Sequence, residues 1–355
     1  MGKIAFVFPG QGAQYVGMAR EVAVWSAKAG ELIRLADDRL GFALSRLMFE
    51  GPAEELTLTA NAQPALVTAS LACYQLLKEA GVVPSVVAGN SLGEYAALAV
   101  AGAMSAEDAI WLVRQRGIYM NEAVPAGVGG MVALLGVDAS QAQALCTVGS
   151  AYGVVEIANY NCPGQIVVSG EAAALAAVKA HAKEHGAKRA VDLAVSGPFH
   201  SSMLKPAGLK LAQAIDQITV HAPQITVIAN YTAQPVETRE AVIDALINQV
   251  SHPVRWEETI RLMAAMGVDT IVEVGAGKVL TGLTKKIAPG ICPVSYTHLD
   301  VYKRQALVSL AALLSNNGSQ AGQKNMLNRQ GPARALFDLF CTNNFSNDQD
   351  FLVDF

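Results

Sequence analysis

A serine between two glycines stands out among the residues that could do chemistry. Gly89-Asn90-Ser91-Leu92-Gly93 follows a short apolar run, residues 85–88, and precedes an alanine-rich stretch, residues 92–100, that is typical of a helix. A strand, a tight turn and a helix in this order form a nucleophile elbow, which lifts the serine hydroxyl above a sheet. The helix N-terminus behind Ser91 offers unpaired N–H groups to a developing oxyanion. The pattern predicts a nucleophile, and an ordinary structural turn is the alternative.

A serine hydroxyl needs a base to take its proton, and the chain has six histidines. His200 lies in a turn with glycine and proline, residues 196–202, that follows an expected strand and would bring the imidazole to the end of a sheet. His181 and His185 share one helix face but have no third metal ligand beside them. We therefore predict His200 as the base and expect no metal site.

The acid of a catalytic triad is harder to find. No carboxylate between Ser91 and His200 has an obvious triad context, and Asp192, on an expected strand, is the best of them. A later residue or a backbone carbonyl must then orient the imidazole.

The elements around these residues alternate in type. Through the first 290 residues, Ala/Leu-rich helical stretches separate short strand-like runs, at residues 3–8, 85–88, 131–136, 166–169, 226–229 and 270–274. This alternation predicts an α/β fold with a mostly parallel, hydrolase-like sheet. Residues 128–194 follow their own order, βαββαβ, which is the ferredoxin-like pattern. We expect a larger catalytic subdomain from residues 1–127 and 195–293, with residues 128–194 inserted into it.

The end of the chain differs from the rest. Residues 306–355 contain seven asparagines, as many as the first 305 residues together. Residues 294–305, Val-Ser-Tyr-Thr-His-Leu-Asp-Val-Tyr-Lys-Arg-Gln, can be back-translated into an almost self-complementary sequence and resemble a translated sequencing-adapter junction. We expect the natural sequence to stop near Pro293, with an artefactual junction at 294–305 and an unrelated, poorly ordered tail at 306–355. An ordinary polar tail is the alternative.

Composition excludes several classes of protein. A net charge of −4 is too balanced for a nucleic-acid binder that relies on phosphate neutralisation. No apolar run approaches the roughly 20 residues of a membrane-spanning helix. The N-terminus has no secretion signal, and the five cysteines form no CxxC, so we expect a cytoplasmic protein. Gly10-Gln11-Gly12 lacks the third glycine of a dinucleotide fingerprint, because Tyr15 stands there.

Several motifs together resemble the malonyl-CoA:acyl-carrier-protein transacylases of fatty-acid synthesis. They occur in the family's order over residues 1 to about 290: Phe8-Pro9-Gly10-Gln11-Gly12-Ala13-Gln14, Gln63-Pro64-Ala65, Gly89-Asn90-Ser91-Leu92-Gly93-Glu94-Tyr95, Arg114-Gln115-Arg116-Gly117, Asn161-Cys162-Pro163-Gly164-Gln165, Val195-Ser196-Gly197-Pro198-Phe199-His200-Ser201 and Glu273-Val274-Gly275-Ala276-Gly277-Lys278-Val279-Leu280. Many members have histidine where this chain has Asn90, which leaves the effect of that residue on acyl selectivity open.

The resemblance implies a catalytic role for each matching residue. Ser91 matches the serine that accepts the acyl group, and His200 matches its general base. The backbone N–H groups of Gln11 and Leu92 match the oxyanion hole. Gln249 matches the residue whose main-chain carbonyl orients the histidine, which would explain the missing triad acid.

Two further matches imply the choice of substrate. Arg116 matches the arginine that pairs with the malonyl carboxylate, and a planar guanidinium suits a buried carboxylate. Phe199 matches a bulky residue of malonyl-selective relatives and would leave little room for a methyl branch.

The resemblance also implies the reaction. A malonyl group would pass from malonyl-CoA, as substrate, to the phosphopantetheine thiol of acyl carrier protein through an acyl-serine, with no bound cofactor. An acidic carrier protein needs a basic patch, for which Lys188 and Arg189 are candidates and Lys285 and Lys286 a second pair. Three alternatives remain: a discrete acyltransferase of a polyketide synthase, a serine hydrolase with the same elbow, and a non-catalytic product in which the foreign tail replaces a natural segment.

Overall fold

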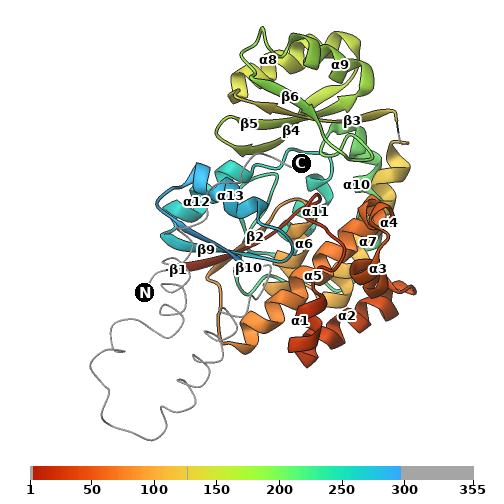
Figure 1. Ribbon diagram of the computed structural model, residues 1–355, viewed down its shortest axis with the longest axis vertical. Coiled ribbons are helices and arrows are strands. Elements are labelled where there is room, and N and C mark those ends of the chain that lie inside the picture. The colour runs from red at the N-terminus through yellow and green to blue at the C-terminus, as the bar shows by residue number, and fades with distance from the viewer. Residues whose placement is uncertain (1–2, 126, 297–355) are drawn as a thin grey trace, which may run out of the picture.

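The computed structural model describes residues 3–125 and 127–296, which form two sheets surrounded by helices (Figure 1). One sheet has six strands in the order β10-β9-β1-β2-β7-β8, and the other has four in the order β4-β5-β3-β6. The predicted α/β fold, with one mostly parallel sheet and a second antiparallel one, is confirmed.

The six-stranded sheet is parallel except at one edge, where β8 runs antiparallel to β7. Its strands are β1 (Lys3–Phe8), β2 (Val86–Gly89), β7 (Thr226–Ile228), β8 (Pro235–Val236), β9 (Val268–Val274) and β10 (Cys292–Tyr296). In β1, Ala5, Phe6, Val7 and Phe8 are all fully buried. Burial on both faces is what a central strand of a parallel sheet requires, and it explains why this run is continuously apolar.

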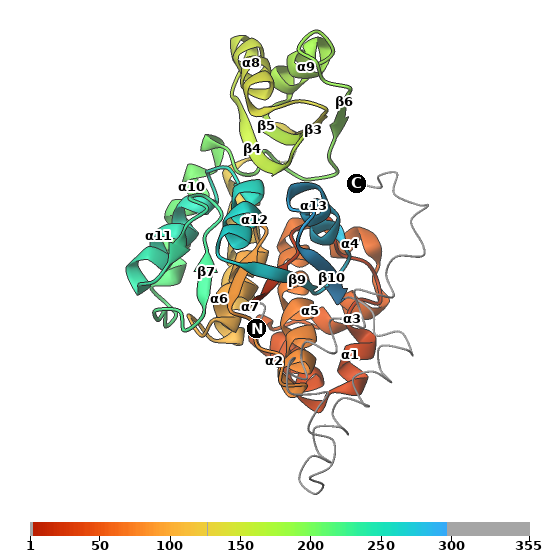
Figure 2. The same cartoon turned by 90° about the vertical axis from the view of Figure 1, so that its left-hand side faces the viewer.

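Alternate residues of β1 enter two different cores. Phe6 and Phe8 face a large cluster, whereas Ala5 and Val7 face a smaller one to which α12 and α13 supply the helical residues. In Figure 2, α12 and α13 lie above β9, whereas α5 and α2 lie below it.

The helices around the six-stranded sheet are α1 (Arg20–Trp25), α2 (Ala27–Leu40), α3 (Leu44–Glu50), α4 (Ala53–Thr57), α5 (Thr59–Glu79), α6 (Gly93–Val100), α7 (Ala106–Ala123), α10 (Lys205–Ile215), α11 (Arg239–Gln249), α12 (Trp256–Ala265) and α13 (Val279–Ile287).

The four-stranded sheet lies beside the larger one, with two helices on its outer face (Figure 1). Its elements are β3 (Gly129–Leu135), α8 (Ala139–Gly149), β4 (Val155–Cys162), β5 (Gln165–Glu171), α9 (Ala172–His181) and β6 (Arg189–Asp192). All its pairings are antiparallel. The β4–β5 turn is shorter than the predicted connection over residues 159–164, because Asn159 and Tyr160 pair with β5 and the strand continues to Cys162.

Strand β10 includes the first residues of the predicted artefactual junction. It pairs in parallel with β9, and Val294 and Tyr296 are buried. The rest of the junction and the predicted tail, residues 297–355, lie outside the described residues. In the described part of the chain, none of the helices combines the length and the apolar character that crossing a membrane requires.

Candidate active site

Ser91 lies in the turn between β2 and α6, with a backbone φ of 51°. That value is in the left-handed region, which costs energy for a residue with a Cβ. The turn is closed by backbone that approaches very tightly. A Cβ on Gly89 would lie 1.8 Å from the carbonyl carbon of Gly93, and a Cβ on Gly93 would lie 2.2 Å from the carbonyl oxygen of Phe8. Only glycine fits at either position, which is the physical reason for the spacing around the serine.

His200 meets this serine from a turn 109 residues further along the chain. Its Nε2 lies 2.7 Å from Ser91 Oγ. Its Nδ1 lies 2.9 Å from the carbonyl oxygen of Gln249 and 3.2 Å from that of His252. Because carbonyl oxygens only accept hydrogen bonds, the proton belongs on Nδ1, and Nε2 is free to accept the serine proton.

The imidazole is therefore oriented by backbone carbonyls. Asp192, the best triad acid by sequence, is ion-paired with Lys179 at 2.8 Å on the small sheet. Burial of His200, helped by the positive charge of Arg116, lowers the pKa of His200 to about 4, although its two carbonyl partners act in the opposite direction. The ring is thus neutral at pH 7, as a general base must be.

Arg116 reaches the same serine from α7. Its Nη2 donates to Ser91 Oγ and to Gln249 Oε1, both at 3.0 Å, and its Nη1 donates to Gln63 Oε1 at 2.7 Å. The side chain is 1% exposed, and its Nε has no hydrogen-bond partner among the described residues. Burial lowers the pKa of the Arg116 guanidinium. All three hydrogen bonds go to neutral oxygens, which a carboxylate could replace as acceptors in a two-pronged contact.

A buried carboxylate that sequence reasoning missed lies behind the serine. Glu94, in the first turn of α6, accepts from the backbone N–H of Asn230 at 3.0 Å and from Gln249 Nε2 at 2.7 Å. Burial raises the pKa of Glu94 to about 7, while these hydrogen bonds and Arg116 favour the ionised form. The only sequence signal was a glutamate three residues after the nucleophile.

The partners of Glu94 hold the backbone of the serine turn. Asn230 Oδ1 accepts from the Ser91 N–H at 2.7 Å, and its Nδ2 donates to the carbonyl of Gly89 at 2.6 Å. Gln249 Nε2 also donates to the Ser91 carbonyl at 2.9 Å. Gln249 therefore contacts nucleophile, base and guanidinium, through its side chain and its carbonyl.

A cavity opens onto these groups between the two sheets. Gln11, Asn90, Ser91, Arg116, Phe199 and His200 all line it, with Met120, Met131 and Val167 among its apolar walls and Leu280 and Leu283 of α13 on another side. Leu92 itself is buried and stands at the N-terminus of α6. In the described part of the chain, the backbone N–H groups of Gln11 and Leu92 donate no hydrogen bond to another backbone group. Of these two residues, Gln11 lines the cavity and Leu92 does not.

The basic residues predicted to contact a carrier protein do not line this cavity. Lys188 and Arg189 are exposed at the start of β6, and Lys285 and Lys286 are exposed in the last turn of α13. None of the four is among the residues that line the cavity.

Comparison with known proteins gives a consistent result. Residues 5–288 match the acyl transferase domain family. The chain is 49% identical over 288 residues to a malonyl CoA-acyl carrier protein transacylase of Bacillus subtilis, covering 81% of this chain and 91% of that protein. It is 44% identical over 288 residues to one of Escherichia coli, covering 81% and 93%.

Solved structures agree with these sequence matches. The fold is similar to an acyl-carrier-protein S-malonyltransferase from Burkholderia pseudomallei, with a TM-score of 0.82, 46% identity and 86% and 99% of the two chains covered. It is also similar to a malonyl-transacylase in complex with a type II polyketide acyl-carrier protein, with a TM-score of 0.82, 39% identity and 88% and 100% of the chains covered.

Proposed function

Since the chain belongs to the malonyl-CoA:acyl carrier protein transacylases, we propose that Ser91 carries the malonyl group between the two substrates. The observation that supports this most is the 2.7 Å contact between Ser91 Oγ and His200 Nε2, with the imidazole held by two backbone carbonyls. A neutral base and a hydroxyl in hydrogen-bond contact are the minimum that nucleophilic catalysis needs. Family membership favours acyl transfer over the serine-hydrolase alternative.

The first half-reaction loads the serine. His200 Nε2 takes the proton of Ser91 Oγ while that oxygen attacks the thioester carbonyl carbon of malonyl-CoA. The carbonyl oxygen becomes an oxyanion that accepts hydrogen bonds from the N–H groups of Gln11 and Leu92, each worth on the order of 3 kcal/mol in the transition state. The C–S bond then breaks, and His200 returns its proton to the sulfur, so that coenzyme A leaves as a thiol.

The second half-reaction transfers the malonyl group from Ser91 to acyl carrier protein. The phosphopantetheine thiol of acyl carrier protein gives its proton to His200 Nε2, and its sulfur attacks the ester carbonyl of malonyl-Ser91. The C–O bond breaks, and the proton passes from His200 to Ser91 Oγ, which restores the free enzyme. Because the first product leaves before the second substrate reacts, ping-pong kinetics follow.

Arg116 selects for malonyl in this proposal. Its Nη2 contact with Ser91 Oγ and its unpartnered Nε put donors next to the acyl group. A malonyl carboxylate would accept hydrogen bonds from those donors, and an acetyl group would leave them without an acceptor. Phe199, which lines the same cavity, narrows the space for a branched acyl chain.

The wider setting is proposed from the family. Malonyl-CoA is the substrate, and no bound cofactor takes part. Acyl carrier protein docks on the exposed pair Lys188 and Arg189. The reaction supplies fatty-acid synthesis in the cytoplasm. A polyketide carrier protein is the second candidate partner, because one 39%-identical relative is a transacylase in complex with such a carrier.

The test is direct loading of the full chain. Incubation with malonyl-CoA should produce a malonyl adduct that mass spectrometry maps to Ser91, and carrier protein should then remove it. Ser91→Ala should form no adduct, and Arg116→Ala should slow malonyl loading far more than acetyl loading. An adduct on another residue would contradict the role of Ser91, and equal losses for both acyl groups would contradict that of Arg116. Release of free malonate without transfer would favour a hydrolase.

A further inference from the structure

The turn that carries His200 is strained and needs support. His200 has a φ of 59°, in the left-handed region, although it is not glycine. Within the turn, Phe199 N donates to the Gly197 carbonyl at 3.0 Å and Ser201 Oγ donates to the Pro198 carbonyl at 2.7 Å. A non-glycine residue persists in this conformation only when the surrounding structure over-determines it. Further contacts must therefore fix where the imidazole points.

A carboxylate from the small sheet supplies such a contact. Glu156, on β4, accepts from the backbone N–H of Ser202 through Oε2 and from Ser202 Oγ through Oε1, both at 2.7 Å. Ser202 follows His200 by two residues. Hydrogen bonds to an ionised carboxylate are stronger than neutral ones, and a pair of them also fixes direction. The base is thereby tied to an element of the other sheet.

The same strand holds the segment that orients the imidazole. Val254 N donates to the Ala158 carbonyl at 2.8 Å, and Tyr160 N donates to the Val254 carbonyl at 2.9 Å. Val254 follows His252, whose carbonyl lies 3.2 Å from His200 Nδ1, by two residues. Strand β4 therefore contacts two segments that position the base. One is Ser202, which follows the histidine, and the other is Val254, which follows the carbonyl partner His252.

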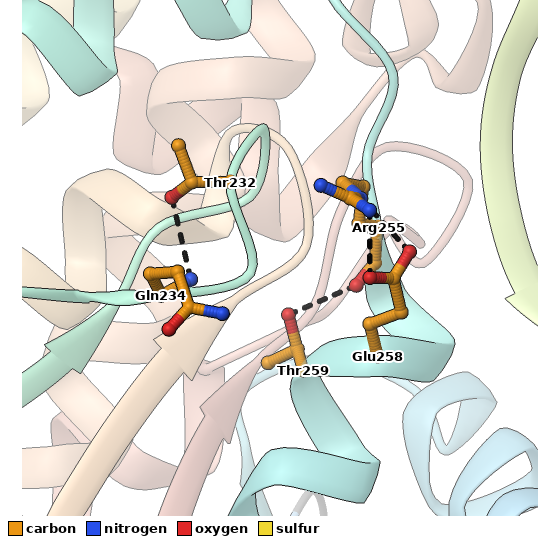
Figure 3. Close-up of polar contacts among 5 residues, drawn as sticks. All are labelled: Thr232, Gln234, Arg255, Glu258 and Thr259. Carbon is orange, nitrogen blue, oxygen red and sulfur yellow. Dashed lines mark hydrogen bonds and ion pairs between the residues drawn. The ribbon is translucent and has the colours of Figure 1, made fainter.

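The far side of that segment is anchored as well. Arg255 N donates to the Asn230 carbonyl at 2.9 Å. In the first turn of α12, Thr259 Oγ1 donates to the Arg255 carbonyl at 3.0 Å and the Arg255 guanidinium pairs with Glu258 at 2.8 Å (Figure 3). The residues that follow Val254 are therefore bonded both to Asn230 and to the first turn of α12.

We infer that Glu156 is a positioning residue for the general base, acting through Ser202. It contacts neither Ser91 nor the ring of His200, so its effect is on where Nε2 lies relative to Ser91 Oγ. The inference rests on the proposed role of His200. Since a displacement of about 1 Å can cost on the order of 100-fold in rate, loss of this support reduces turnover much more than binding.

Three variants of the full chain test it. Glu156→Ala should lower kcat about 10- to 100-fold for malonyl loading and by a similar factor for transfer to carrier protein, with the KM for malonyl-CoA changed less than about twofold. Both steps slow together because His200 serves both. Glu156→Gln should recover most of the rate, because its amide can still accept from the Ser202 N–H and donate to Ser202 Oγ. Ser202→Ala, which removes only one of the two contacts, should fall in between.

The matched control is Glu171→Ala. Glu171 belongs to the same sheet and also accepts from a backbone N–H, that of Val154, at 2.7 Å, but it holds no part of the His200 turn. It should leave kcat within about twofold of wild type. The inference is overturned if Glu156→Ala loads Ser91 at the wild-type rate, or if Glu171→Ala slows loading equally. Should Glu156→Ala fail to fold, a wild-type rate in Ser202→Ala overturns it instead. Failure of the wild-type chain to form any Ser91 adduct would count against the proposed function itself.

Discussion

The turn of Ser91 and the turn of His200 present a similar strain and stabilise it differently. Both hold a non-glycine residue at positive φ, 51° and 59°. The serine turn is shaped first by its own sequence, because the glycines at 89 and 93 let the backbones of β2 and α6 pass in contact. The side chains of Asn230 and Gln249 then hold that backbone by hydrogen bonds. The histidine turn depends on distant segments: the carbonyls of Gln249 and His252 and the carboxylate of Glu156.

The two turns differ because a local motif is enough to expose the serine, whereas the imidazole needs partners that only the complete fold brings near it. A nucleophile needs exposure above the sheet and N–H groups behind it, and both come from one strand–turn–helix unit. A base needs a defined tautomer and a defined direction, and its hydrogen-bond partners can come from anywhere in the chain. The serine turn should therefore respond most to backbone changes within the motif, and the histidine turn to side chains far from it.

The largest effect is expected from Gly93→Ala. The added Cβ would lie 2.2 Å from the Phe8 carbonyl oxygen, and both partners are backbone, so neither can move aside easily. We expect about 3 kcal/mol of lost stability in urea unfolding, together with loss of Ser91 loading.

Gly282→Ala is its control. Gly282 lies in α13, and a Cβ there meets nothing within 4 Å. The change should be neutral or stabilise by about 0.5–1 kcal/mol, because alanine favours a helix. Equal stability of the two variants would mean that the close crossing does not specify the serine turn.

The same contrast explains what could be predicted from sequence. Apolar runs bounded by turn residues located β1 and the core of β9, and the glycine spacing located Ser91, because these signals are local. His200 was favoured by its turn, but its orientation by Gln249 came only from the family resemblance. Glu94 and Asn230 were missed, since the bonds that join them to Gln249 and Ser91 span 155 and 139 residues and leave no periodic pattern.

Glu94→Gln should have the next largest effect. Its Oε2 accepts from both the Asn230 N–H and Gln249 Nε2, and an amide oxygen can take that place. The amide N–H₂ would then replace Oε1, to which none of the described residues donates a hydrogen bond, so the new donor is buried without an acceptor. A buried donor left without an acceptor costs about 1–3 kcal/mol. Gln249 links Glu94 to Ser91 and Arg116, so a shift of Gln249 would displace both side chains. We therefore expect kcat for malonyl loading to drop about 10-fold or more.

Glu273→Gln is the matched control for this variant. Glu273 is equally buried and accepts from the backbone N–H groups of Leu280 and Thr281, at 3.0 and 2.7 Å, at the start of α13. It should lower stability by a comparable amount while leaving the loading kcat near wild type. Equal kcat losses in both variants would show that burial of a carboxylate, and not its link to the serine turn, governs the rate.

The smallest effect concerns pH, where the two turns should act in opposite directions. The pKa of His200 is about 4 in the folded protein and about 6.5 unfolded, so the unfolded chain takes up the proton first and stability is lost as pH falls from 6.5 to 4. The pKa of Glu94 is about 7 folded and about 4.3 unfolded, so stability is lost as pH rises from 4.3 to 7.

These two contributions nearly cancel between about pH 4.5 and 6.5, and single variants should separate them. Glu94→Gln removes the carboxyl titration, so its stability should rise with pH by about 1 kcal/mol per unit more steeply than that of wild type. His200→Gln removes the imidazole titration and should shift the slope by a similar amount in the opposite sense. Urea unfolding of the three proteins at pH 5, 5.5, 6 and 6.5 measures both slopes. Parallel curves would mean that neither group titrates differently on folding, and the view that burial sets the charge state of both turns would then be wrong.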